Sequence, residues 1–80
     1  MSRYQLAKLD FRRGHALSAQ KTLLPLNNSA QMNAESLWLG IQIDHALTHT
    51  QDMHKLGKRL MEKFPQSVQA KAWTDKKFHD

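Results

Sequence analysis

The chain repeats its pattern of small and apolar residues, and this repeat restricts the fold more than any other feature. Leu6-Ala7 recurs as Leu39-Gly40, and Ala19 recurs as Met53. A period of about 33–34 residues is typical of arrays of helical hairpins, in which each unit buries its apolar face against the next. The sequence therefore predicts two similar hairpins, at about 3–30 and 31–66, with one extra residue in the turn of the second.

Apolar residues recur at three- and four-residue spacing, and no segment alternates with period two over the length of a strand. Helix ends are indicated by Gly14 and Pro65, a late kink or end by Pro25, and N-caps by Thr50 and Ser67. We therefore predict an all-α fold of five helices, the last of which caps the array. Their expected ranges are about 3–13, 16–26, 31 or 34 to 47, 50–64 and 67–80.

Gly40 lies inside the third predicted helix, where glycine costs about 1 kcal/mol relative to alanine. We interpret it as a packing glycine at the point where the second helix of its hairpin crosses, with Ala7 at the matching point of the first. Trp38, on a different face, is expected to pack against a neighbouring hairpin. The residues predicted to serve structural packing are Leu6, Ala7, Ala19, Trp38, Leu39, Gly40, Leu60 and Pro65.

Length and composition exclude several classes of protein. Eighty residues form one small domain, and the absence of cysteine removes disulfides and thiolate chemistry. There is no apolar run long enough to span a membrane, so the chain as written is expected to be soluble. The net charge of +5 is spread along the whole chain, which favours a solvated surface over a single basic tract.

The histidines pose the question of a metal site. His45 and His49 stand on one face of a helical turn and His54 follows, while Asp44 or Asp52 could complete a ligand set. No glutamate lies between the two histidines in the manner of HExxH, and His49 falls at the predicted helix end. We therefore predict no metal site. Serines at helix starts and isolated glycines likewise indicate no catalysis, no cofactor and no small-molecule substrate.

Nucleic-acid binding is the competing class of function. Basic residues recur on one side of the fourth predicted helix and continue in the fifth, where Trp73 and Phe78 could stack on bases. The basic set is Lys55, Lys58, Arg59, Lys63, Lys71, Lys76 and Lys77. Polar base-reading residues are poorly placed beside it, so a solvated basic face is favoured.

Three segments carry a resemblance to a known family. ESLWLGIQI at residues 35–43, FPQS at 64–67 and LAKLDFRRG at 6–14 resemble the C-terminal repeats of the tetratricopeptide type IV pilus biogenesis and stability proteins (PilW/PilF family). The SLWLG run followed by FP-x-S is the more specific part, because small residues at repeat positions are common to all tetratricopeptide proteins. The chain departs from the repeat consensus at Met53, where alanine is usual, and at Gly57, where a large apolar residue is usual. These two departures leave the tightness of the second hairpin open.

The resemblance implies a function and a location. Family members are outer-membrane lipoproteins that face the periplasm and act as pilotins, which help the pilus secretin to assemble. The chain is then expected to be the C-terminal part of a longer protein, with membrane association only through an N-terminal lipid anchor. The implied partner is the secretin. A generic tetratricopeptide adaptor, similar to a co-chaperone, is the alternative.

Helical-repeat arrays bind peptides in the concave surface that the first helices of their hairpins form. Repeat register predicts the groove residues Tyr4, Lys8, Arg12, Leu37, Ile41, Asp44 and His45. This mixture of apolar and charged side chains suits a peptide with an acidic side. An apolar N-terminal patch also makes weak self-association an expected property.

Overall fold

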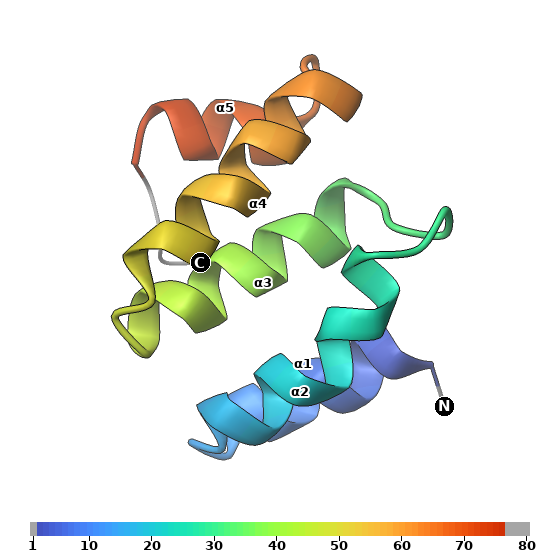
Figure 1. The fold of residues 1–80 in the computed structure, drawn as a ribbon, viewed down its shortest axis with the longest axis vertical. Helices are drawn as coiled ribbons and strands as arrows, with labels where there is room; N and C mark the ends of the chain where they lie inside the picture. Colours follow the sequence, from blue (N-terminus) through green and yellow to red (C-terminus); the bar gives the residue numbers. More distant parts are fainter. Residues whose placement is uncertain (1, 77–80) are drawn as a thin grey trace.

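The computed structural model describes residues 2–76, which form five α-helices and no strand (Figure 1). The prediction of an all-α fold with five helices is confirmed for this part of the chain. The helices are α1 (Arg3–Arg12), α2 (Ala16–Asn27), α3 (Ala34–Ala46), α4 (Thr50–Lys63) and α5 (Val68–Thr74). Phe78, which the sequence analysis placed in the last helix, lies outside the described residues.

Side-chain caps explain where three of the helices begin. Ser2 and Asn33 each accept a hydrogen bond from the backbone N–H of the third helical residue, in capping boxes with Gln5 and Ser36. Ser67 caps α5 as predicted. Thr50 is not the cap of α4: His49 takes that position and makes no side-chain cap hydrogen bond, and its Nδ1 lies 3.0 Å from Gln20 Nε2 of α2 instead.

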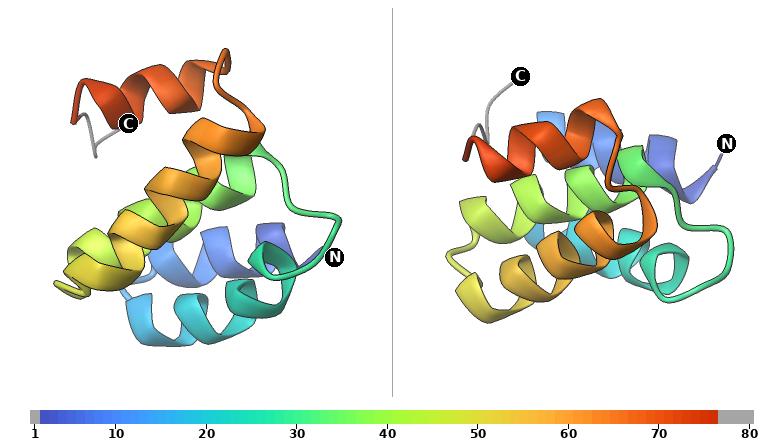
Figure 2. Two further views of the ribbon diagram at one scale, coloured as in Figure 1. Left: turned by 45° about the horizontal axis from the view of Figure 1, so that its top comes forward. Right: turned by 90° about the horizontal axis from the view of Figure 1, so that it is seen from above.

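The helices pack as two antiparallel pairs followed by α5. α1 packs on α2 and α3 on α4, while α2 packs on α3 and α5 covers α3 and α4. In the right-hand view of Figure 2, α1 and α5 lie along one side of the molecule, α2 and α4 along the opposite side, and α3 between them. The central position of α3 decides which of its residues reach the surface.

Two apolar cores meet across α3. One contains Leu37, Ile41, Met53, Leu60, Ala70 and Trp73. The other contains Ala7, Ala19, Leu23, Leu39 and Ile43. Because α3 supplies residues to both cores from opposite faces, it is apolar around most of its circumference, as expected of an enclosed helix.

α2 does not end before Pro25 but continues through it to Asn27. Proline removes one helical hydrogen bond, and the last turn of α2 bends away from the axis of the helix (Figure 1). Side chains hold this turn in place: the Asn27 amide donates to the Ser36 carbonyl at 3.1 Å, and Arg59 donates to the Asn27 carbonyl at 2.6 Å. The bent end of α2 is thereby tied to both α3 and α4.

Gly40 lies at a close approach of helices. A β-carbon there would lie 2.7 Å from Leu56 Cδ1 of α4 and 2.8 Å from Asn27 Nδ2 of α2. The glycine therefore admits the second helix of its own hairpin, as predicted, and also the end of the preceding hairpin.

Gly57 has a role that the sequence analysis did not foresee. A β-carbon at this position would overlap the six-membered ring of Trp73 and lie 2.8 Å from its Nε1. The second hairpin has no gap at Gly57, because the indole of α5 fills the space that a large side chain there would occupy. Met53, the other departure, is buried in the same core.

Two packing expectations need correction. Leu6 is 42% exposed, because no described helix packs on that face of α1. Pro65 is exposed and follows the end of α4 without entering either core. In α5, Ala70 and Trp73 form the buried face, and Val68 is 80% exposed.

The turns of the two hairpins show that the repeat has a period of 34 throughout. His15 N–H donates to the Asp10 carbonyl at 2.8 Å, and His49 N–H donates to the Asp44 carbonyl at 2.8 Å. The residue before each histidine has a positive φ, +83° at Gly14 and +59° at Thr48. The first helices of the two hairpins therefore match with a period of 34 instead of the predicted 33.

Candidate functional site

A groove runs across α1 and α3, which are the first helices of the two hairpins, and across α5. Its volume is about 530 Å³. The lining residues come from α1, α3 and α5, and they are Tyr4, Lys8, Phe11, Arg12, Glu35, Trp38, Leu39, Gln42 and Gln69. We call this surface the α1–α3–α5 groove.

The α1 side of the groove contains the three residues that the sequence analysis placed there. Lys8 Nζ lies 5.8 Å from the centre of the Tyr4 ring, within reach of a cation–π contact. Burial raises the pKa of the Tyr4 phenol, Glu35 raises it further by its negative charge, and Arg12 opposes both. Charges from α1 and α3 therefore act on one aromatic ring.

On the α3 side, the sequence-based assignment is wrong for Leu37, Ile41 and Asp44. Leu37 and Ile41 are fully buried in the core shared with α4 and α5, and Asp44 is 3% exposed and faces another cleft. His45 is exposed but does not line the groove.

The error is one of register. A period of 34 makes Trp38 the equivalent of Tyr4 and Gln42 the equivalent of Lys8, and all four line the groove. A period of 33 pointed instead to the neighbouring core residues. The sequence did contain a signal for the period of 34. An aspartate is followed five residues later by a histidine at Asp10 and His15, and again at Asp44 and His49.

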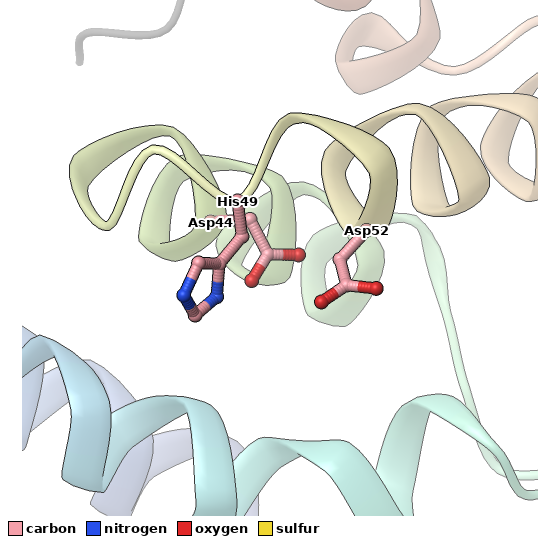
Figure 3. A group of neighbouring side chains, drawn as sticks. All are labelled: Asp44, His49 and Asp52. Atoms are coloured by element: carbon pink, nitrogen blue, oxygen red, sulfur yellow. The ribbon is translucent and has the colours of Figure 1, made fainter.

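A second cleft, of about 390 Å³, lies between α2 and α4 with α3 at its base. It is lined by Gln20, Leu23, Leu24, Asn27, Asn28, Gly40, Asp44, Asp52, Lys55, Leu56 and Arg59. We call it the α2–α4 cleft. Figure 3 shows Asp44 and Asp52, together with the adjacent His49, directed toward α2 across this gap.

Asp44, His49 and Asp52 form a compact group. Each offers a ligand atom, and these atoms all lie within 4.8 Å of one another. Gln20 Nε2 donates to Asp44 Oδ1 at 2.7 Å and lies 3.0 Å from His49 Nδ1. Burial raises the pKa of the Asp44 carboxyl; the Gln20 hydrogen bond lowers it, the charge of Asp52 raises it and that of His49 lowers it.

The other histidines and the basic residues lie elsewhere. His54 packs edge-on against Trp73, with ring centres 5.7 Å apart, and is not part of the group around Asp44. Trp73 itself is buried beneath α4 and has Lys76 Nζ 4.1 Å from its ring centre. The nucleic-acid alternative required Trp73 to stack on a base, and a buried indole is not available for this.

Comparisons with known proteins add no family. No protein-family model, no curated protein and no solved structure matches the chain. Among the described residues, no helix has the length and apolar character needed to cross a membrane.

Proposed function

We propose that the chain is a non-catalytic protein-interaction module that binds a peptide segment with acidic side chains in the α1–α3–α5 groove. The observation that supports this most is the composition of the groove. Two half-buried aromatic rings, Tyr4 and Trp38, lie beside the exposed cations Lys8 and Arg12. Aromatic and arginine side chains are the residues that most often carry binding energy at protein interfaces.

Charge indicates the chemistry of the partner. The groove is lined by two cationic side chains, Lys8 and Arg12, and by one carboxylate, Glu35. The groove is thus net positive at its α1 edge, and arginine can pair with a carboxylate through two hydrogen bonds. Gln69 adds an amide group, which can donate and accept hydrogen bonds with the backbone of an extended peptide.

The resemblance described above gives the proposal a specific form. If the chain is a tetratricopeptide module of the pilus biogenesis family, the acidic segment belongs to the periplasmic part of the type IV pilus secretin. A generic tetratricopeptide adaptor would use the same groove with another acidic peptide.

Calorimetric titration of groove variants with overlapping secretin peptides tests the proposal. We expect Arg12→Gln and Trp38→Ala each to weaken binding of one acidic peptide by at least about tenfold, as hot-spot residues do. Because Trp38 also packs on the core, its variant is first checked for helix content.

Lys58→Gln is the matched control, since Lys58 is exposed on α4 and does not line the groove. Its affinity should equal that of the wild type. Equal losses in Lys58→Gln and Arg12→Gln would indicate diffuse charge attraction and contradict the proposal.

A further inference from the structure

Asp44, His49 and Asp52 are held together by the backbone of the α3–α4 turn. Asp44 lies in the last turn of α3, Asp52 in the first turn of α4, and His49 between them. The His49 N–H bond to the Asp44 carbonyl and the positive φ of Thr48 fix the path of the chain. One imidazole and two carboxylates therefore converge without depending on a flexible loop.

The equivalent positions of the first hairpin show what is unusual here. Ser18 takes the place of Asp52 and its hydroxyl donates to Asp10 Oδ2 at 3.2 Å. In the second hairpin a carboxylate replaces that donor and lies near the Asp44 carboxylate. Two carboxylates at this distance repel each other unless a proton or a cation lies between them.

Asp44 has no lysine or arginine as a hydrogen-bond partner among the described residues. It is almost fully buried, and its hydrogen-bond donor is the neutral amide of Gln20. A buried carboxylate is ordinarily paired with a positive charge or a metal ion. Lys55 and Arg59 line the same cleft, yet Arg59 is bonded to the Asn27 carbonyl and Asn28 Oδ1 instead.

The Gln20 amide holds the place that a cation would take. Its Nε2 lies 2.7 Å from Asp44 Oδ1 and 3.0 Å from His49 Nδ1. A metal ion bound to both atoms would therefore displace this amide, and imidazole binds such an ion in its neutral form.

We propose that Asp44, His49 and Asp52 bind a divalent first-row transition-metal ion such as Zn²⁺. Nitrogen and carboxylate ligands suit these ions, and bonds of about 2.0–2.2 Å place neighbouring ligand atoms roughly 3.4 Å apart. The exposed side chains of His49 and Asp52 can close the remaining distance onto the fixed Asp44. With three protein ligands, water completes the coordination, and the ion links the end of α3 to the start of α4.

Thermal denaturation of the whole chain, purified with a chelator, tests this site with ZnCl₂ and with MgCl₂. Zn²⁺ should raise the melting temperature because it binds the folded state, whereas Mg²⁺ should have no effect at the same concentration. Asp52→Ser, which reproduces the first hairpin, and His49→Gln should each reduce Zn²⁺ affinity at least tenfold. Asp44→Asn should do the same.

His45→Gln is the control, because His45 is exposed one turn away and lies outside the group. Its Zn²⁺ affinity should remain within twofold of the wild type. NMR spectra of the imidazole nitrogens should show the response to Zn²⁺ at His49 Nδ1. An unchanged affinity in Asp52→Ser, or an equal loss in His45→Gln, would mean adventitious binding at surface histidines and would overturn the proposal.

Discussion

The two hairpins share one backbone and differ in the side chains placed on it. Their turns carry the same hydrogen bond at equivalent positions, from His15 to Asp10 and from His49 to Asp44. Leu23 belongs to the core of the first hairpin, whereas Gly57, its equivalent, makes room for Trp73 of α5.

The difference follows from what surrounds each pair. α3 and α4 lie between α2 on one side and α5 on the other, whereas the other face of α1 has no described neighbour. Leu6 is consequently exposed, while Gly40, its equivalent in the second hairpin, is enclosed by two helices. Enclosure, and not the repeat itself, gives the second hairpin the buried polar side chains Ser36 and Asp44.

The largest expected effect comes from the enclosed core. Leu60→Ala should destabilise the fold by about 3–4 kcal/mol, because Leu60 is fully buried and its truncation leaves a cavity. Leu26→Ala, at the equivalent position of the first hairpin, should cost clearly less, since Leu26 is only partly buried. Urea denaturation followed by circular dichroism measures both values, and equal losses would contradict the comparison.

The second largest effect is expected from a change at Gly57, which distinguishes the second hairpin from the first. Gly57→Leu should cost about 2–3 kcal/mol, because it forces the Trp73 ring out of its place. In the double variant with Trp73→Ala the two losses should not add, since the leucine can occupy the vacated space. Additive free energies of unfolding would show that Gly57 and Trp73 are not coupled.

Substitutions in the two hairpin turns should have smaller effects on stability, with opposite signs in the two turns. Thr48→Gly should stabilise the fold by about 0.5–1 kcal/mol, because a β-branched residue at positive φ is strained and glycine is not. Gly14→Thr should destabilise it by about 1 kcal/mol for the same reason. Thermal melts of both variants provide the check, and changes of the same sign in the two would refute the shared turn geometry.

The smallest effect is a dependence on pH. Burial holds the pKa of Asp44 above its unfolded value, so its ionised form destabilises the fold. Stability from this group is present below the ordinary aspartate pKa and is lost as pH rises through the raised pKa. With chelator present, Asp44→Asn should therefore stabilise the fold at neutral pH and lose this advantage below about pH 4.

Asp10→Asn gives the cost of the same chemical change in the first hairpin, where the side chain is only partly buried. Denaturation across pH compares the two variants. A gain for Asp44→Asn that persists unchanged at low pH would exclude titration of Asp44 as its cause.

The fold could be predicted from the sequence because helical periodicity, capping residues and the repeat all act locally. Ser67 as a cap follows from its immediate neighbours, and Gly40 as a close approach follows from the cost of a glycine inside a helical segment. The partner of Gly57 could not be predicted, since Trp73 reaches it from a helix that lies outside the repeated unit.

The candidate groove was predictable on α1 but not on α3. Tyr4, Lys8 and Arg12 lie on a helix with one buried face, so periodicity alone identifies its open side. α3 is apolar on two faces, and a register error of a single position exchanged Trp38 for Leu37. The convergence of Asp44, His49 and Asp52 depends on how the turn folds, which residue spacing within a helix does not reveal.

The central claim is that the α1–α3–α5 groove binds an acidic peptide, and an NMR titration tests it most directly. Labelled chain would be titrated with periplasmic secretin peptides at about 150 mM salt, where weak charge attraction is damped. The account predicts saturable shifts at Lys8, Arg12, Gln42 and the Trp38 indole. Saturable shifts confined to the α4 lysines, with none in the groove, would contradict it.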